Sequence, residues 1–518
     1  MTETVKITFY PSRIEGVVPK GTTILEAARM LGIGIEGPCN GSGTCSKDLV
    51  QVRRNKTIDT VLACKMIIDD DLEVIVPSHE NTALKTVEHF HSLENLPSTT
   101  PAPPYQGGEF GIALDIGTTT IVAALVDLNS GESVGTTSTL NPLVFYGHDV
   151  MSRIRHSVTE KDGLLKMHRE LISAVNLLID LLTADTEIRP ENIRQLVAAG
   201  NTTMQHIFLN KEIASIGAYP YKAEVLDAFT TTAGDLAVGI AEGATVTTFP
   251  CMSAYVGGDI VSGLIAVNLD KSKLPALFID IGTNGEMALL SEGRTVATST
   301  AAGPCFEGMT ISCGMRAAEG AIERVSFEEE LSLGVIGEGP ARGICGSGLL
   351  DLVAELIRIG LVNSRGRLHG RESNDVPKAY RERIFEKNGK RHFKVTENIS
   401  ISQEDIRQVQ LARAAIRSGV EVLMIENGIE ADQLNSVIIA GGFGYHLRKE
   451  SLLTVGLLPA FTGATFSFVG NTSLEGARRL LLDKGLAEKS TSIARNVSVV
   501  ELANVEGFEA KFVGAMCF

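Results

Sequence analysis

An Asp-Ile-Gly-Thr tetrapeptide occurs twice in this chain of 518 residues, at Asp115 and at Asp280. Each copy ends an apolar run that predicts a buried strand, and each is followed by a second strand-like run, over 121–127 and 287–290. The copies are 280 − 115 = 165 residues apart, which is far longer than the period of a solenoid repeat. The spacing therefore predicts a duplicated α/β domain with a ligand cleft between its two halves.

The two Gly-Thr turns have the composition of phosphate-binding loops. Glycine allows close approach of the backbone, and the exposed N–H groups and hydroxyls can cradle phosphate oxygens. An aspartate at the strand end can hold a hydrated Mg²⁺ or orient an attacking water. One copy alone is also typical of an ordinary turn, but two copies favour a nucleotide triphosphate gripped from both sides.

The predicted nucleotide site follows from these loops. Glu286 is either an additional acid near the γ-phosphate or an exposed glutamate at the start of a strand. We predict Asp115 and Asp280 as the catalytic carboxylates, and Gly117, Thr118, Thr119, Thr120, Gly282, Thr283, Asn284 and Gly285 as phosphate-binding residues.

A third apolar run, over 436–440, ends in the glycines Gly441 and Gly442, followed by Phe443. Paired glycines at a strand end let an adenine and a ribose lie flat on the backbone. A tight connection from strand to helix has the same composition. Together with the paired phosphate loops, the pattern favours an adenosine site at these three residues.

Three cysteines and an aspartate near the N-terminus form a different motif: Cys39, Cys45, Asp48 and Cys64. A glycine-rich loop with closely spaced cysteines and a distant last cysteine is typical of a ferredoxin 2Fe–2S site. Asp48 stands three residues after Cys45, where a third cysteine is expected. Asp48 either ligates iron or is a substitution that weakens the cluster, with water or a reordered side chain as ligand. A loop without a cluster is disfavoured by the three cysteines that remain.

The chain divides into three parts by pattern. Residues 1–85 read as strands at 5–10 and 15–19, a helix at 22–31 with a Thr23/Glu26 capping box, the cysteine loop and a strand at 71–77. This order predicts an α+β β-grasp ferredoxin domain. Residues 86–108 are a Pro-rich linker, and residues 109–518 form the α/β domain.

Composition excludes several classes of protein. A net charge of −15 argues against a nucleic-acid binder. We find no apolar run of about 18 residues, which disfavours a membrane span, and no secretory signal at the N-terminus. Eight cysteines are too few for a disulfide scaffold, so we expect a cytoplasmic protein.

The three glycine loops carry a resemblance. They are similar to the first phosphate, second phosphate and adenosine motifs of the superfamily that contains acetate kinase, sugar kinases, heat-shock chaperones and actin. Segments 197–203 and 341–351 resemble the connecting segments of that superfamily. The resemblance implies a duplicated actin-like (ribonuclease H-like) ATPase domain that binds ATP and Mg²⁺.

A ferredoxin domain joined to such an ATPase resembles the reductive activators of corrinoid-dependent methyltransferases. Segments 257–260, 301–304, 314–318 and 470–473 add to this likeness. It implies an ATP-hydrolysing activase that passes one electron from a 2Fe–2S cluster to the Co(II) of a corrinoid protein, which regenerates Co(I). It also implies a homodimer and an electron donor that the sequence does not name. The alternatives are an activator of a dehydratase and a small-molecule kinase with an appended redox domain.

Overall fold

The computed structural model describes residues 3–10, 14–31, 33, 35, 48–54, 57–75, 109–184, 186, 188–269, 271–328, 330–373, 376–442 and 447–518. Cys39, Cys45, Phe443 and the predicted linker 86–108 lie outside these residues. The chain forms two compact units. One comprises Met1–Thr82 with Met309–Ser312, and the other comprises Ala83–Gly308 with Cys313–Phe518.

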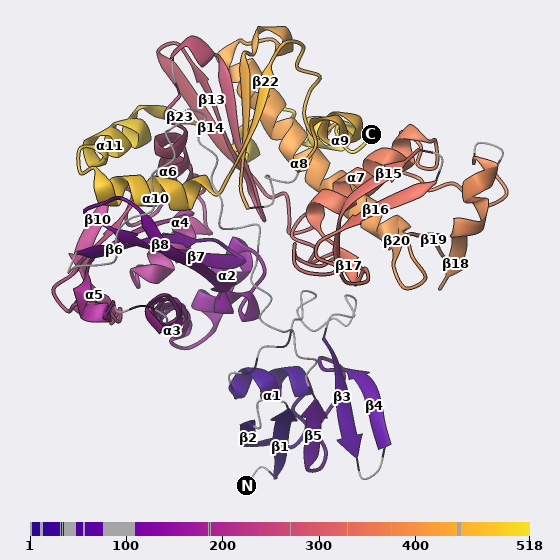
Figure 1. Ribbon diagram of the computed structural model, residues 1–518, viewed down its shortest axis with the longest axis horizontal. Helices are drawn as coiled ribbons and strands as arrows, with labels where there is room; N and C mark the ends of the chain where they lie inside the picture. The colour runs from indigo at the N-terminus through magenta and orange to yellow at the C-terminus, as the bar shows by residue number, and fades with distance from the viewer. Residues whose placement is uncertain are drawn as a thin grey trace. The chain divides into compact units, whose positions relative to one another are not determined.

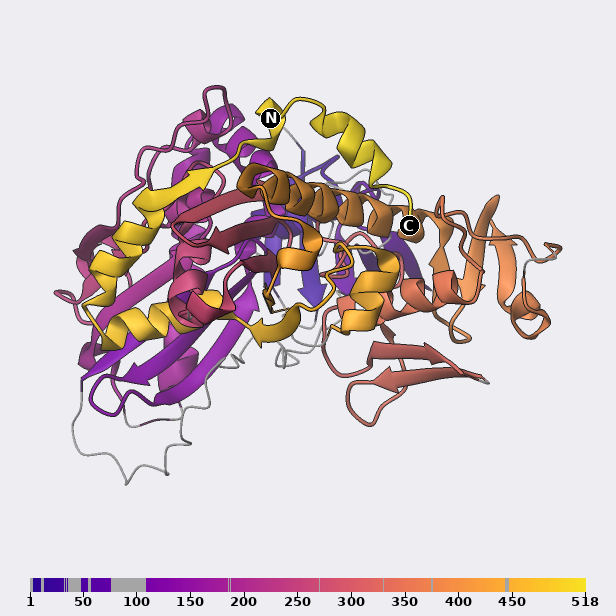
Figure 2. The ribbon, with the colours of Figure 1, turned by 90° about the horizontal axis from the view of Figure 1, so that it is seen from above.

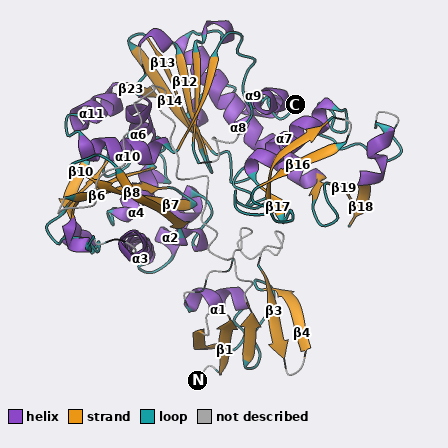
Figure 3. Ribbon diagram, viewed as in Figure 1, coloured by secondary structure: helices purple, strands orange, loops and turns teal. Residues whose placement is uncertain are grey.

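The N-terminal unit is built on a five-stranded mixed sheet with the order β2-β1-β5-β3-β4 (Figure 3). β1 pairs with β2 in an antiparallel and with β5 in a parallel arrangement, and β3 pairs antiparallel with both β5 and β4. The predicted strands are confirmed, whereas the β3–β4 hairpin was not predicted. The strands are β1 (Thr4–Tyr10), β2 (Ile14–Pro19), β3 (Leu49–Arg54), β4 (Thr57–Leu62) and β5 (Leu72–Ile75).

Helix α1 (Ile24–Met30) packs its apolar side into the core of this unit. Its predicted capping box is confirmed: the Glu26 N–H donates to Thr23 Oγ1 at 3.2 Å, and the Thr23 N–H donates to Glu26 Oε2 at 3.0 Å. These bonds satisfy backbone donors that a helix start leaves without partners. Ile24 and Ala28 are buried against strand residues such as Ile7 and Phe9.

The larger unit contains two six-stranded sheets, and they share one topology (Figure 1). In each, three consecutive antiparallel strands are extended by two parallel strands beside the first, in the orders β8-β7-β6-β9-β11 and β14-β13-β12-β21-β22. β10 and β23 each add one further edge strand. The two sheets thus repeat one arrangement of five strands, which is the arrangement expected of a duplicated domain.

The strands of the first sheet are β6 (Phe110–Ile116), β7 (Thr120–Asp127), β8 (Ser133–Leu140), β9 (Ile193–Gly200), β10 (Phe229–Thr232) and β11 (Thr245–Thr248). Those of the second are β12 (Ala276–Ile281), β13 (Gly285–Ser291), β14 (Arg294–Thr300), β21 (Ser436–Ala440), β22 (Thr465–Gly470) and β23 (Val497–Val499). Each Asp-Ile-Gly-Thr motif lies in the corresponding place of its sheet, at the turn between the first strand and the second.

Helices cover both sheets and fill the space between them. α3 (Gly163–Ala184) packs on one face of the first sheet. α8 (Gln403–Asn427), the long orange helix in Figure 2, packs along β13 and β14 of the second sheet. α6 (Gly258–Val267) is apolar on two sides: its Val261 belongs to a core with the first sheet, and its Ile260 to a core with the second. α10 (Thr472–Leu482) packs on α6, β6 and β9. The starts of α6 and α10 are therefore positioned where the two halves meet.

Two small sheets, β16-β15-β17 and β18-β19-β20, complete the larger unit (Figure 1). Among the described residues, no helix combines the length and the apolar character needed to cross a bilayer. The remaining strands are β15 (Ala321–Phe327), β16 (Leu331–Val335), β17 (Gly343–Ile344), β18 (Ile384–Lys387), β19 (Lys390–Lys394) and β20 (Ser400–Ser402). The remaining α-helices are α2 (Val150–Thr159), α4 (Thr202–Phe208), α5 (Ala233–Leu236), α7 (Gly346–Arg358), α9 (Lys449–Val455), α11 (Leu486–Asn496) and α12 (Phe508–Gly514).

Candidate functional site

Asp48 and Cys64, two of the four predicted metal ligands, lie side by side in the N-terminal unit. Antiparallel pairing of β3 with β4 places Leu49 opposite Leu62, so that the residues flanking the hairpin meet. The Cys64 N–H donates to Asp48 Oδ2 at 2.6 Å, and the Ala63 N–H donates to the Asp48 carbonyl at 2.8 Å. Neither contact depends on a bound metal.

The Asp48 side chain is fully buried, with 0% of its surface exposed, and within the described residues its Oδ1 has no hydrogen-bond partner. Leaving a carboxylate oxygen buried and bare costs free energy unless something else satisfies it. Among the described residues, Asp48 Oδ2 is therefore fixed by a hydrogen bond, and Oδ1 is available to a further ligand. Among the described residues, no three His, Cys, Asp or Glu side chains are arranged to ligate one metal ion directly, and the two other predicted ligands lie outside these residues.

A single pocket in the larger unit brings together both Asp-Ile-Gly-Thr loops and the third glycine loop. Of the residues predicted from sequence, the pocket is lined by Asp115, Gly117, Thr118, Thr119, Thr120, Asp280, Gly282, Thr283, Asn284, Gly441 and Gly442. Gly285 does not line it; this residue begins β13, and a Cβ there would lie 2.8 Å from Thr300 Oγ1. The structure therefore gathers nearly all of the predicted nucleotide-binding residues that it describes.

Gly441 is needed for the third loop to approach the second. Its φ is +96°, and a Cβ at this position would lie 2.6 Å from the Ile281 carbonyl oxygen and 2.7 Å from Asp280 Oδ1. Only glycine adopts this conformation and this approach without strain. The close packing keeps the end of β21 against the end of β12, and both ends line the pocket.

The two Asp-Ile-Gly-Thr loops are joined directly through their threonines. Thr119 Oγ1 lies 3.0 Å from Thr283 Oγ1, and the Thr283 hydroxyl donates to Glu307 Oε1 at 2.8 Å. Since Thr283 gives its only hydroxyl proton to Glu307, Thr119 must be the donor in the bond between the threonines. Glu307 lines the pocket and was not among the residues predicted from sequence.

Two asparagines that were not predicted as site residues form hydrogen bonds with side chains of the first loop. Asn471 donates from Nδ2 to Asp115 Oδ2 at 2.8 Å and caps α10 by accepting the Leu474 N–H at 2.9 Å. Asn201 donates from Nδ2 to Thr118 Oγ1 at 2.9 Å and caps α4 in the same way. Each asparagine follows a strand within a Gly-Asn-Thr sequence, at 200–202 and 470–472, and this internal repeat was the signal that could have found them.

The pocket concentrates acidic groups. Its lining includes the carboxyl groups of Asp115, Asp259, Asp280 and Glu286. Asp259 lies in the first turn of α6, and Glu286 is 6% exposed. Glu286 is therefore a buried pocket residue rather than an exposed strand start.

The acidic groups shift one another's protonation. Burial in the cleft, reinforced by the charge of Asp259, raises the pKa of Asp280 to about 8. Burial likewise raises the pKa of Asp115 to about 7, although the hydrogen bond from Asn471 acts in the opposite direction. The pKa of Glu286 is raised well above its usual range, first by burial and then by Asp259 and Asp280. Clustered carboxyls of this kind suit a hydrated divalent cation, which would replace the missing solvation.

The comparisons with known proteins agree with this geometry. Residues 275–518 match the family described as the C-terminal domain of RACo, the ASKHA domain, and residues 110–272 match the RACo middle region. The corrinoid activation enzyme RamQ of Eubacterium limosum is 30% identical, over 96% of this chain and 95% of that protein. The Co(II) methylated amine-specific corrinoid protein reductase of Methanosarcina barkeri is 26% identical, over 76% of this chain and 74% of that protein.

A solved structure shares the fold over nearly the whole chain. It is titled a reductive activator for corrinoid, iron-sulfur protein, is 31% identical and superimposes with a TM-score of 0.75, covering 99% of this chain and 98% of that one. Likeness of this extent in both sequence and structure identifies the family. This chain belongs to the RACo family of corrinoid reductive activators.

Proposed function

We propose that this protein is an ATP-dependent reductive activator that transfers one electron from a 2Fe–2S cluster to the Co(II) of a corrinoid protein and so regenerates Co(I). The observation that carries the proposal is the meeting of both Asp-Ile-Gly-Thr loops at one pocket, with 3.0 Å between their threonine hydroxyls, in a chain of this family. Membership of the family favours this activity over the kinase and dehydratase-activator alternatives.

The N-terminal unit is proposed as a β-grasp ferredoxin domain. Its five-stranded mixed sheet, its single described helix and its cysteine loop between α1 and β3 support this assignment. Cys39, Cys45, Asp48 and Cys64 would hold the cluster, which supplies one electron at a time when bound. The residues described at the site fit such a group: Asp48 Oδ1 is buried and has no hydrogen-bond partner among the described residues, and Asp48 Oδ2 accepts the Cys64 N–H.

In the larger unit, Asp115 and Asp280 are proposed to hold Mg²⁺ and to orient the attacking water. Thr118, Thr119, Thr283 and other loop residues would donate to phosphate oxygens, as loops rich in glycine and threonine do in nucleotide sites. The bond between Thr119 and Thr283 must open for both hydroxyls to reach a phosphate. We place the adenosine at Gly441, Gly442 and Phe443.

ATP is needed because the Co(II)/Co(I) couple of corrinoids lies at very low potential. Nucleotide binding can favour the conformation of the activator that docks the corrinoid protein. The shift it produces is limited to the difference in its affinity for the two conformations. The proposed partner is a corrinoid protein of a methyltransferase system, and the donor that reduces the cluster is a separate, unidentified protein. We also propose a homodimer located in the cytoplasm, with domain boundaries at 85/86 and 108/109.

Replacement of Asp280 by alanine tests the assignment of chemistry to the two units. We expect loss of ATP hydrolysis, measured as phosphate release, while the visible absorption of the iron–sulfur cluster stays at the wild-type level. Retained hydrolysis would remove Asp280 from the catalytic site, and simultaneous loss of both signals would contradict two separately folded units.

A further inference from the structure

Strand β15 has an edge that its neighbouring strand covers only in part. β16 pairs with β15 along its length, but β17 pairs with it only at Ala321 and Ile322. Beyond that point the backbone N–H and C=O groups of Val325 and Phe327 on this side have no strand partner among the described residues. Backbone groups in such a position need other partners, and here side chains provide them.

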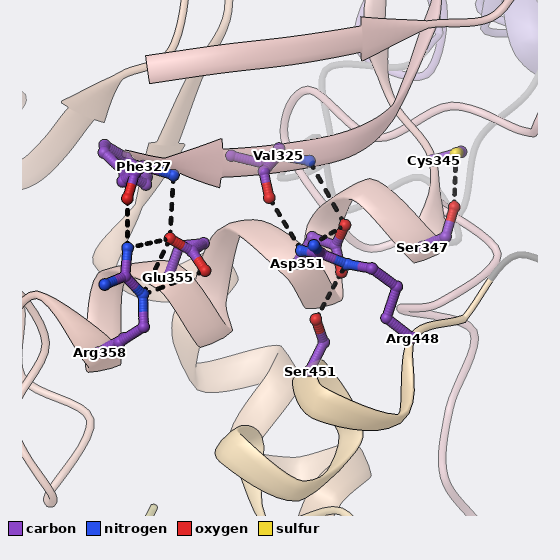
Figure 4. A network of polar contacts seen from close by, with 9 residues as sticks. All are labelled: Val325, Phe327, Cys345, Ser347, Asp351, Glu355, Arg358, Arg448 and Ser451. Carbon is purple, nitrogen blue, oxygen red and sulfur yellow. Dashed lines mark hydrogen bonds and ion pairs between the residues drawn. The ribbon is translucent and has the colours of Figure 1, made fainter. Parts of the chain in front are cut away.

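Two carboxylate–guanidinium pairs form hydrogen bonds with the backbone groups of this edge (Figure 4). Their carboxylates lie one helical turn apart on α7. At Phe327, Glu355 Oε2 accepts the N–H at 2.9 Å, and Arg358 donates from Nη2 to the carbonyl. At Val325, Asp351 Oδ2 accepts the N–H at 3.4 Å, and Arg448 donates from Nη2 to the carbonyl at 3.0 Å. The two pairs therefore perform the same task on successive turns of α7.

They differ in where the arginine comes from. Arg358 lies on α7 itself, three residues after Glu355, so that pair is local. Arg448 is the N-cap residue of α9 and reaches Asp351 from 97 residues away, with Nε 2.9 Å from Oδ1 and Nη2 2.9 Å from Oδ2. Ser451, on the first turn of α9, adds a hydrogen bond to Asp351 Oδ1 at 2.5 Å. Asp351 is thus bound to α9 by three contacts.

The segments joined in this way both line the nucleotide pocket. Cys345, Gly346 and Ser347, at the start of α7, are part of its wall, and so are Gly441 and Gly442, which precede α9. Asp351 lies four residues beyond Ser347, and Arg448 lies six residues beyond Gly442. The ion pair is outside the pocket, but it connects the two stretches of chain that form part of it.

We propose that Arg448 and Asp351 are positioning residues that fix the spacing between the start of α7 and the Gly441–Gly442 loop, and thereby set the affinity for the nucleotide. The proposal rests on the ATP site proposed above. The side chain of Asp351 is 3% exposed, so removal of Arg448 leaves a buried carboxylate without its cation. A buried charge that loses its partner is strongly destabilising, and α9 would move away from α7 to hydrate it.

A test compares Arg448→Met with Arg358→Met, because each removes a guanidinium that binds the same edge of β15 and a carboxylate of α7. The protein is used as the full chain, and the dissociation constants of Mg-ATP and Mg-ADP are measured by calorimetry, with kcat and KM for hydrolysis. For Arg448→Met we expect both dissociation constants to rise by about 10-fold or more, with kcat changed by less than about 3-fold, since a hydrogen-bonded ion pair is lost but no reacting group is touched. Arg358→Met should leave both constants within about 2-fold of wild type.

Arg448→Lys and Ser451→Ala cover the case in which Arg448→Met does not fold. Lysine keeps the charge but cannot make the two-pronged contact, and alanine removes only one of the three contacts, so both should weaken ATP binding by smaller factors than Arg448→Met. Wild-type affinity in Arg448→Lys and Ser451→Ala together, or an equal loss of affinity in Arg448→Met and Arg358→Met, would overturn the proposal. Failure of the wild-type protein to bind Mg-ATP would instead contradict the proposed function.

Discussion

Replacement of Asn471 by aspartate separates two roles that this side chain plays. Its Oδ1 caps α10, and its Nδ2 donates to Asp115 at 2.8 Å. Aspartate is as good an N-cap residue as asparagine, so the helix start should be preserved. The donor facing Asp115, however, becomes an acceptor that carries a negative charge. The substitution therefore perturbs the orientation and the protonation of Asp115 without removing the cap.

The structure sets the size of the effect. A hydrogen bond to a charged group contributes about 1.5–3 kcal/mol. If it is lost in the transition state of hydrolysis, kcat/KM for ATP falls by about 10- to 150-fold, at about 1.4 kcal/mol per factor of ten. Burial already raises the pKa of Asp115 to about 7, and the hydrogen bond from Asn471 is the contribution that lowers it. A second carboxylate in place of that donor raises the pKa further, so the acid limb of the pH–rate profile should move to higher pH.

The assay is steady-state phosphate release between pH 6 and 9, combined with thermal unfolding of the same samples. Asn471→Ser serves as the matched control, because serine caps a helix without placing a charge beside Asp115. Its kcat/KM should fall less than that of Asn471→Asp. Its pH profile should move toward higher pH by less, because the amide donor is lost but no negative charge is added. Asn471→Ala removes the cap as well as the donor, so its free energy of unfolding should also fall by about 1 kcal/mol.

Wild-type kcat/KM together with an unshifted pH profile in Asn471→Asp would refute this reasoning. Such a result would mean either that Asp115 takes no part in hydrolysis or that Asn471 does not orient it. A large loss of thermal stability in Asn471→Asp, equal to that of Asn471→Ala, would instead show that the cap had not been preserved.

Three further predictions follow from the same structure. Asp48→Cys should raise the reduction potential of the cluster and change its electron paramagnetic resonance spectrum, because a hard oxygen donor favours ferric iron more than thiolate does. An unchanged potential and spectrum would mean that Asp48 is not a ligand. The raised pKa of Asp280, about 8, means that the folded, nucleotide-free protein binds a proton that the unfolded chain releases above its ordinary pKa of 3.8. The free energy of unfolding should therefore fall as pH rises from 4 to 8, by up to about 1.4 kcal/mol per pH unit for this group. Asp280→Asn should make this pH dependence less steep in chemical unfolding. An equally steep pH dependence in the variant would exclude Asp280 as its source. Gly441→Ala, at φ +96°, should lose about 1–2 kcal/mol of stability and most ATP binding, and normal ATP affinity in that variant would argue against the adenosine assignment.

Features that depend on neighbouring residues were predicted from the sequence with few errors. Short sequence patterns predicted the capping box at Thr23 and Glu26, and it is present in the structure. They also predicted the strands that flank both Asp-Ile-Gly-Thr motifs, which are present as well. The β3–β4 hairpin was not predicted, because no strand was assigned to the residues between Asp48 and Cys64. Asp48 and Cys64 lie side by side only because that hairpin pairs as it does.

Contacts between distant residues were not predictable from one sequence. Asn471 lies 356 residues from Asp115, and Arg448 lies 97 residues from Asp351, so no local pattern links either pair. Asp259 enters the pocket because α6 lies between the two sheets, which follows from tertiary packing and not from its own segment. Burial of Glu286 was left open from the sequence for the same reason, since it depends on what covers the start of β13.

The central claim is tested most directly by mixing the protein, with its cluster reduced, with a corrinoid protein in the Co(II) state, and recording the Co(I) absorption band with and without Mg-ATP. We expect the band to appear with ATP and to be absent or to form much more slowly without ATP, and we expect Asp280→Ala to abolish this difference. Co(I) formation at the same rate without nucleotide, or no Co(I) with any corrinoid protein of a methyltransferase system, would contradict it.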